Sequence, residues 1–342
     1  MKLLIVTQKI DKIDDNLGFF HRWVEEFAKH ATEIKVIAGY VGQIDLPINV
    51  QIFSLGKEKR RNKIYRIFNF WKLLFKNYDK ADAIFFHMAP EFVLAAVPWV
   101  LFGKSKSSLW YTHKSVTWKL QLAEKLVNII FTASRLSFRL PSKKVMYTGH
   151  AIDTEFFKPG ADQRTKNSNI KIITVGRLSP SKDYETIIQA CSDLKERGIG
   201  FNYSIVGAPV APKDQKYVSN LQRLVHKLGL QGVINFMGPI SYLNMPLVYN
   251  QYDIFISTSS TGSIDKAILE AMSCGLTVIT TNEAFREVLP DKYFLSEKTP
   301  KNISEKILEL ALESRPNNLL RSLVINKHSL DSTIKSICAL LS

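Results

Sequence analysis

The sequence predicts an α/β protein made of two doubly wound domains, and three observations support this fold class. Short apolar runs alternate with amphipathic segments along the whole chain, which is typical of parallel sheets covered by helices. The length of 342 residues fits two domains of about 150 residues each. The polar stretch Lys158–Asn169 separates the two halves and is expected to be a linker. We therefore expect domains at 1–157 and 158–325, with two sheets facing across a ligand cleft, and a C-terminal helix at 326–342 that returns toward the first domain.

The apolar runs place the strands of both halves. In the first half the expected strands are Lys2–Thr7, Ile34–Ala38, Ala83–Met88, Ser108–His113, Ile129–Ser134 and Val145–His150. In the second half they are Ile170–Val175, Tyr203–Val206, Val233–Met237, Asp253–Ser257 and Thr277–Thr281. The segments between them have helical spacing; one example is Tyr184–Arg197, whose apolar residues fall on one face.

Composition narrows the class of protein and its partners. Three cysteines, far apart, form neither a metal-binding spacing nor a disulfide framework, so a reducing cytoplasm is the expected location. Met1–Thr7 is expected to be a buried strand rather than a secretory signal, and the longest apolar run, Phe92–Phe102, is too short to span a bilayer. The net charge is +15, of which residues 1–160 carry +11. Such a basic first half favours an acidic partner: nucleic acid, anionic lipid or a phosphorylated substrate.

The segment Ser257–Thr281 predicts a strand end, a loop, a helix and another strand. Its loop, Ser257–Ser263, contains only Ser, Thr and Gly, so its backbone amides can approach a ligand closely. The helix expected at Asp265–Met272 stops before Gly275, and a helix N-terminus after such a loop favours anions. Glu270 lies inside that helix and is expected to face the same cleft. Amides for phosphate and a carboxylate for hydroxyls together suit a nucleotide sugar.

A second segment, Ile172–Lys182 (IITVGRLSPSK), supplies positive charge. A buried strand is expected to end at Gly176, followed by Arg177, a turn and Lys182. The planar fork of Arg177 and the point charge of Lys182 are both able to bind one diphosphate. The alternative interpretation is that these are two solvated loop cations.

These motifs resemble a known family. VGRLSPSK, SIVG (Ser204–Gly207), NFMG (Asn235–Gly238) and SIDKAILEAMSCGLTVITT occur in the order and spacing of the C-terminal domain of the retaining glycosyltransferases of family 4, the glycosyl transferases group 1. GHAIDTEFFKP (Gly149–Pro159) resembles the link between their domains. The resemblance covers about residues 145–290 and implies a GT-B fold, in which two Rossmann-like domains face each other across a cleft.

The resemblance implies roles for individual residues of the second half. Arg177 and Lys182 would bind the diphosphate of the donor and offset the charge on the leaving group, and Glu270 would accept hydrogen bonds from the ribose. Ser263 and Ile264 would present backbone amides, and a loop at Phe236–Gly238 would line the base pocket. The expected donor-binding set is Gly18, Gly176, Gly207, Phe236, Met237, Gly262, Ser263, Ile264 and Glu270.

In the first half, the resemblance is limited to a few positions. Gly18 lies before the helix expected at Phe19–His30, where a small residue would let donor and acceptor approach; alternatively it is only a turn glycine. His113, at the end of an expected strand, would lie near the transferred sugar and is expected to be catalytic. The alternatives are that its ring is satisfied by backbone, or that His87 has this role.

One position departs from the family pattern. The family has two glutamates separated by seven residues; Glu270 is the second, and Gly262 stands at the first. The first glutamate normally contacts hydroxyls of the donor sugar. Another group could read the sugar, the sugar could differ, or activity could be lost. The sequence leaves the donor base, the sugar, the acceptor and the oligomeric state open.

The implied reaction transfers a sugar from a nucleotide sugar to a hydroxyl of a glycan or lipid-linked acceptor with retention of configuration. It needs orientation and charge stabilisation but no protein nucleophile, cofactor or metal, since Arg and Lys can replace a divalent ion. The alternatives are a catalytically weak subunit that binds nucleotide sugar or a partner transferase, a nucleotide-sugar epimerase of the same fold, and a basic protein that binds nucleic acid or a membrane surface. No recognised nucleic-acid module supports the nucleic-acid alternative.

The stretch Lys57–Lys76 is both basic and aromatic. Ile64, Ile67, Phe68, Trp71 and Phe75 fall on one helical stripe surrounded by cations. The simpler interpretation is a helix that packs this stripe on the first sheet. The other is peripheral contact with an anionic membrane.

Overall fold

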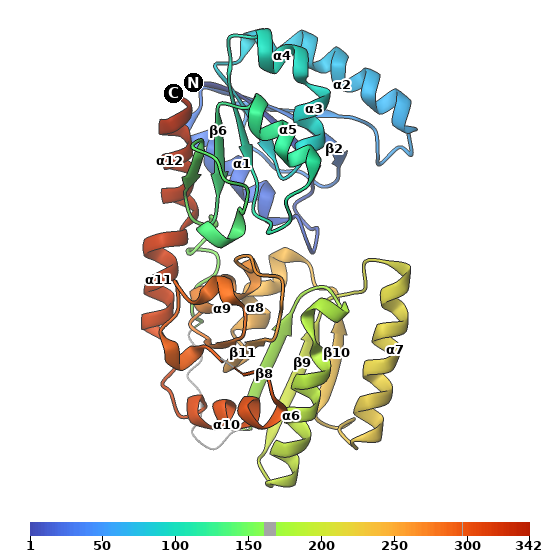
Figure 1. The fold of residues 1–342 in the computed structure, drawn as a ribbon, viewed down its shortest axis with the longest axis vertical. Coiled ribbons are helices and arrows are strands. Elements are labelled where there is room, and N and C mark those ends of the chain that lie inside the picture. Colours follow the sequence, from blue (N-terminus) through green and yellow to red (C-terminus); the bar gives the residue numbers. More distant parts are fainter. Residues whose placement is uncertain (161–168, 296) are drawn as a thin grey trace. The chain divides into compact units, whose positions relative to one another are not determined.

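The computed structural model describes residues 1–160, 169–295 and 297–342 (Figure 1). The chain divides into two compact units. The first unit contains Met1–Asp153, Ser241–Leu243 and His328–Ser342, and the second contains Thr154–Ile240 and Asn244–Lys327. Most of the expected linker, residues 161–168, lies outside the described residues. In the described part of the chain, every helix falls short of the length and apolarity needed to cross a membrane.

The first unit is built from alternating strands and helices. Its elements are β1 (Lys2–Ile10), α1 (Phe19–His30), β2 (Glu33–Val41), β3 (Val50–Ser54), α2 (Lys63–Asn77), β4 (Ala83–His87), α3 (Pro90–Ala95), α4 (Val97–Phe102), β5 (Lys106–Trp110), α5 (Trp118–Leu126), β6 (Ile129–Thr132), β7 (Val145–Tyr147) and α12 (Leu330–Leu341). Its described strands form a parallel seven-stranded sheet in the order β3-β2-β1-β4-β5-β6-β7. The predicted fold class is confirmed, although the half-buried strand β3 was missed.

Helices cover both faces of this sheet because its strands alternate apolar side chains between the two faces. On β1, Leu3 and Ile5 pack with α1 and α12, whereas Leu4 and Val6 pack with α2, α3, α4 and α5. Figure 1 shows α2 to α5 gathered together and α12 beside α1. Side chains on both faces of β1 are buried, which explains why its sequence is a continuous apolar run.

The second unit repeats the same plan on a smaller scale. Its elements are β8 (Ile170–Val175), η3 (the 3₁₀ turn Pro180–Lys182), α6 (Tyr184–Glu196), β9 (Phe201–Val206), α7 (Pro212–Lys227), β10 (Ile234–Gly238), α8 (Met245–Tyr249), β11 (Ile254–Ser257), α9 (Lys266–Ser273), β12 (Thr277–Thr280), α10 (Pro300–Leu310) and α11 (Asn318–His328). The described strands form a parallel sheet in the order β10-β9-β8-β11-β12. The strand order therefore reverses between β8 and β11, and ligands of open α/β sheets bind outside the strand ends at such a point.

The C-terminal segment differs from the single helix expected at 326–342. Two helices, α11 and α12, meet at Ser329, because the chain there pairs with the backbone of Ile152: Ile152 N–H donates to the His328 carbonyl and Leu330 N–H to the Ile152 carbonyl, each at 2.7 Å. Helix α12 then packs with α1 in the first unit, where Ile334 and Ile337 are fully buried.

Candidate functional site

The switch point of the second sheet brings together the two segments that the sequence singled out. β8 and β11 pair in parallel, with Ile254 opposite Ile172, so both strands end at the same edge of the sheet. The segment from Gly176 to Lys182 follows β8, and the Ser257–Ser263 loop follows β11. Hydrogen bonds join the two: Thr258 Oγ1 donates to the carbonyls of Lys182 at 2.9 Å and Asp183 at 2.8 Å. Ser260 N–H donates to the Ser181 carbonyl at 3.2 Å.

Glycines let the ends of three strands meet at this edge. Gly176 has φ +155° and Gly207 has φ +136°, which side chains rarely tolerate. A Cβ on Gly207 would lie 2.0 Å from the Gly176 carbonyl oxygen. Gly207 N–H donates to the Gly238 carbonyl at 2.9 Å, so the three glycines pack together at the carboxyl ends of their strands. Their predicted position at the site edge is supported by packing; contact with a ligand stays a prediction.

Lys182 is buried at this edge and forms an ion pair with Asp265. Its Cε lies 3.2 Å from where a Cβ on Gly176 would stand, so a larger residue at 176 would displace the lysine side chain. Arg177 lies on the same loop with an exposed side chain. One cation is therefore held in place by a carboxylate, and the other is presented to solvent.

Asp265 is the residue whose role the sequence interpretation missed. Its side chain caps helix α9 by accepting a hydrogen bond from Ala267 N–H at 3.3 Å, and it also pairs with Lys182. Because a carboxylate at a helix N-terminus interacts favourably with the helix dipole, Asp265 occupies the place predicted for an anion. Its position directly before a helix, as Asp at an N-cap, was the available signal.

Gly262 and Ser263 precede this cap. Gly262 has φ +61°, in the left-handed region that favours glycine. The Asn282 side-chain amide donates to the Ser263 carbonyl at 2.8 Å, which fixes the loop just before Ile264 and α9. A glutamate at position 262 would be strained on this backbone, so the loop conformation of this chain fits glycine and not the glutamate of the family pattern.

Glu270 lies on α9, one and a half turns after the cap, and is buried. Tyr249 Oη donates to its Oε2 at 3.3 Å, and Lys266 Nζ lies 4.0 Å from its Oε1. Burial raises the pKa of Glu270 to about 7, against the opposing effects of Lys266 and Tyr249. Lys266 four residues before Glu270 follows helical spacing and was visible in the sequence; Tyr249 comes from α8 and was not.

The other predicted residues of the second unit differ in part from expectation. Phe236 and Met237 belong to strand β10 and not to a loop, because the strand continues to Gly238 through an irregularity in its pairing with β9. Met237 is partly exposed, and Tyr252 Oη lies 3.4 Å from its sulfur. Both residues still lie toward the carboxyl end of β10, whose last residue, Gly238, accepts a hydrogen bond from Gly207 N–H.

The candidate residues of the first unit agree only in part with the sequence predictions. Gly18 directly precedes α1, as predicted, and a Cβ there would lie 2.4 Å from the Asp14 carbonyl oxygen, so its own loop requires glycine. His113 does not end a strand: β5 stops at Trp110, and the exposed His113 accepts a hydrogen bond from Ser115 N–H at 3.1 Å. The rival His87 is buried, stacked on Phe20 with ring centroids 3.9 Å apart.

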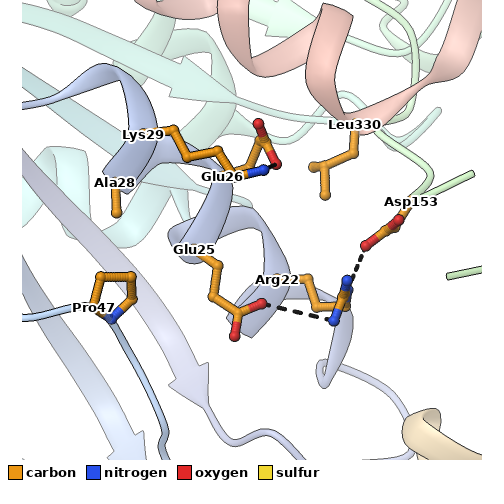
Figure 2. Close-up of a pocket in the computed structure, with 8 residues that line it drawn as sticks. All are labelled: Arg22, Glu25, Glu26, Ala28, Lys29, Pro47, Asp153 and Leu330. Carbon is orange, nitrogen blue, oxygen red and sulfur yellow. Dashed lines mark hydrogen bonds and ion pairs between the residues drawn. The ribbon is translucent and has the colours of Figure 1, made fainter. Parts of the chain in front are cut away.

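A pocket of about 430 Å³ also lies in the first unit, beside α1 (Figure 2). No residue that the sequence singled out lines it. Its charges are already paired: Arg22 with Asp153 and Glu25, and Lys29 Nζ with Glu26 Oε2 at 2.6 Å. Glu26 also belongs to a group with His30 and Asp331 whose potential ligand atoms all lie within 4.8 Å of one another. Lys29 supplies a positive charge beside that group, so an added cation would have to compete with it.

Solved structures show the class of fold to which these two units belong. The Anabaena protein HepE in complex with UDP has a TM-score of 0.78 and 16% identity, with 100% of this chain and 99% of that chain covered. Its complex with UDP-glucose has a TM-score of 0.76 and 16% identity at the same coverage. A sucrose-phosphate synthase from Thermosynechococcus elongatus has a TM-score of 0.77 and 13% identity, covering 99% and 98%. The chain has the GT-B fold.

The family follows from the second half. Residues 158–327 match the model of the family described as glycosyl transferases group 1, and this part of the chain belongs to that family. Curated relatives include a putative colanic acid biosynthesis glycosyltransferase of Escherichia coli, 28% identical over 41% of this chain and 34% of its own length. A human protein, one component of the phosphatidylinositol N-acetylglucosaminyltransferase, is 26% identical over 64% of this chain and 45% of its own length. The chain therefore spans about a third to a half of the curated relatives it matches.

Proposed function

We propose that this protein is a glycosyltransferase that moves a sugar from a nucleoside diphosphate sugar to a hydroxyl of a glycan or lipid-linked acceptor, with retention of configuration. The observation that carries the proposal is the meeting of Lys182, the Ser257–Ser263 loop and the N-terminus of α9 at the switch point of the second sheet. The names of group 1 relatives and the UDP found in similar folds support the same conclusion.

Different residues are proposed to bind different parts of the donor. Lys182 provides a charge close to the strand ends, and Arg177, exposed on the same loop, provides a planar fork able to close on the diphosphate. Charge-assisted hydrogen bonds of this kind contribute about 1.5–3 kcal/mol each. Glu270 accepts hydrogen bonds from ribose hydroxyls once it is ionised, and its Tyr249 partner holds it in position.

The chemical step needs stabilisation of a leaving group. The bond from the anomeric carbon to the diphosphate breaks, and a bond from that carbon to the acceptor oxygen forms on the same face. The acceptor proton leaves with a phosphate oxygen. Cations preorganised around the diphosphate stabilise the charge that develops there, and no protein nucleophile or metal ion is required. His113 is proposed to lie near the transferred sugar.

The Lys182–Asp265 ion pair gives this site a feature of its own. A diphosphate that binds Lys182 competes with the Asp265 carboxylate, so donor binding includes an exchange of anionic partners. With Gly262 in place of the family's first glutamate, Asp265 is also the carboxylate nearest in the sequence to the missing one. The donor-sugar contact is thus proposed to differ from the family pattern.

The acceptor and the compartment follow from composition and relatives. Curated relatives are named for colanic acid biosynthesis and for the transfer of N-acetylglucosamine to phosphatidylinositol, which supports a glycan or lipid-linked acceptor. The three cysteines are unpaired and buried, which fits a reducing cytoplasm.

The test is release of nucleoside diphosphate from a panel of nucleotide sugars, with acceptor mixtures and with EDTA. Arg177→Ala and Lys182→Ala should each lower turnover at least about tenfold, since each removes a charge-assisted contact. Lys227→Ala, at an exposed cation on α7, is the matched control and should leave turnover unchanged. Wild-type rates in both site variants would overturn the assignment.

The second candidate is a catalytically weak subunit that binds nucleotide sugar, and Gly262 favours it. Saturable donor binding without any release of nucleoside diphosphate would select this alternative over the transferase.

A further inference from the structure

Helix α2 carries two apolar stripes, only one of which packs in the core. Phe70 and Leu74 are buried against the first sheet. The second stripe lies on another face of the helix at helical spacing and consists of residues 41–82% exposed: Ile64, Phe68, Trp71 and Phe75. The simpler interpretation of the sequence, that this stripe faces the sheet, is therefore wrong. Large apolar side chains lined up in this way on a surface indicate an interaction site.

The exposed stripe continues onto the neighbouring helix. The Trp71 indole N–H donates to the Ala95 carbonyl at 2.9 Å, which fixes α2 against α3. The C-terminal end of α4, with exposed Leu101 and Phe102, lies next to the residues after α2, since a Cβ on Gly103 would be 2.2 Å from the Tyr78 ring. Figure 1 shows α2 beside α3 and α4. We call the exposed residues of this region the α2 surface: Ile64, Phe68, Trp71, Phe75, Leu101 and Phe102.

Positive charge surrounds the α2 surface. The stretch 59–78 contains seven Lys and Arg residues and neither Asp nor Glu. Lys72 and Lys76 project from the helix as exposed side chains, and the loop before it adds exposed Lys59, Arg60 and Arg61. Long basic side chains that flank aromatic residues place their charges at the level of lipid headgroups while the aromatic rings enter the interface.

We infer that the α2 surface binds an anionic lipid bilayer. Charge complementarity selects this partner, because the combination of aromatic side chains, surrounding cations and no acidic side chain within 59–78 matches the negative surface of such a bilayer. A protein partner bound to the same face would have to leave these cations exposed at the rim of the interface or pair each of them with an acidic side chain. The inference is independent of the proposed function, since vesicle binding requires neither donor nor turnover.

The experiment is co-sedimentation of the full chain, without nucleotide sugar, with vesicles of pure phosphatidylcholine or of phosphatidylcholine with phosphatidylglycerol. The protein should sediment with the anionic vesicles at low salt, sediment less at high salt, and stay in solution with the neutral ones. Size-exclusion chromatography with light scattering, without lipid, measures self-association on the same samples.

Two pairs of variants separate the contributions of apolar and charged side chains. Phe68→Ser with Phe75→Ser removes aromatic area, and its control is Leu247→Ser with Leu312→Ser at exposed positions of the second unit. Lys72→Glu with Lys76→Glu reverses charge, and its control is Lys216→Glu with Lys227→Glu on α7. Each α2 double variant should bind anionic vesicles at least about tenfold more weakly, and each control should bind as the wild type does.

Three outcomes would overturn the inference. The first is that the wild type does not sediment with anionic vesicles at low salt, and the second is that the α2 variants bind the vesicles as well as the controls do. The third is that the wild type and the controls form a dimer, the α2 variants do not, and none of them binds vesicles. Circular dichroism and thermal unfolding of each variant establish that the α2 variants are folded. Nucleoside diphosphate release in free solution should be unchanged in the Phe68/Phe75 variant, which keeps a failure of lipid binding distinct from a failure of the proposed function.

Discussion

The switch points of the two parallel sheets have the same topology and contain different side chains. In the first sheet, between β1 and β4, aromatic packing fills the position: His87 stacks on Phe20, and its Nδ1 lies 3.2 Å from Thr7 Oγ1. In the second sheet, between β8 and β11, a Lys182–Asp265 ion pair and a loop of hydroxyl side chains occupy it. Topology therefore locates a candidate position, and the side chains decide whether it is packed or polar.

The largest expected effect concerns the packed switch point, which is the one between β1 and β4 in the first sheet. Phe20→Ala should lower the free energy of unfolding by about 3–5 kcal/mol, because Phe20 is fully buried between Trp23 and His87. Urea unfolding followed by tryptophan fluorescence measures the change. Phe75→Ala, at an exposed phenylalanine of the same unit, is the control and should cost less than about 0.5 kcal/mol. A small loss in Phe20→Ala would mean that this position is not a packed core.

The next effect concerns the buried carboxylate of Glu270, beside the polar switch point, which is the one between β8 and β11 in the second sheet. Because the pKa of Glu270 is raised in the folded protein, to about 7, its protonated form stabilises the fold. That contribution is complete below about pH 4 and is lost as pH rises through 7, with a total on the order of 3 kcal/mol. Unfolding of wild type and Glu270→Gln across pH 4–8 measures it, and the variant should lack this component. Parallel pH profiles would contradict the proposed burial of an ionisable group.

A smaller effect tests the competition at the polar switch point. Asp265→Asn keeps a side chain able to cap α9 but removes the charge that pairs with Lys182. We expect UDP to bind about three- to tenfold more tightly, because it then no longer has to displace a carboxylate from the buried Lys182. Calorimetric titration of the variant and of Asp265→Ala, which also loses the cap, measures the change. Weaker binding in Asp265→Asn would show that the carboxylate positions Lys182 instead of competing with the ligand.

The smallest effect concerns the glycine that replaces the family's first glutamate. Gly262→Ala should lower the free energy of unfolding by about 1 kcal/mol, since alanine is strained at φ +61°. A gain in stability, the usual result where the backbone suits alanine, would contradict the left-handed conformation at this position. Thermal unfolding of the two proteins distinguishes the two signs.

The sequence predicted most of the fold because buried parallel strands are continuous apolar runs. Ile170–Val175 was placed with its observed bounds, whereas the half-buried Val50–Ser54 lacked such a run and was missed. Arg177, Lys182 and Glu270 were singled out by motif and spacing, and their contact with a donor stays a prediction. The Lys182–Asp265 pair and the Tyr249 contact join residues 83 and 21 positions apart, so only the fold reveals them. The simpler interpretation of the exposed α2 stripe, that it packs on the sheet, was wrong because periodicity shows only that an apolar stripe exists. It does not show which of two stripes on the same helix faces the core.

The central claim is that the polar switch point of the second sheet binds a nucleoside diphosphate through Lys182. Calorimetric titration of UDP into the wild type, Lys182→Ala and the control Lys227→Ala tests it most directly. We predict saturable binding in the wild type and the control, and at least about tenfold weaker binding in Lys182→Ala, as expected for the loss of one charge-assisted contact. Equal affinity in all three proteins, or no binding of any nucleoside diphosphate by the wild type, would contradict the account.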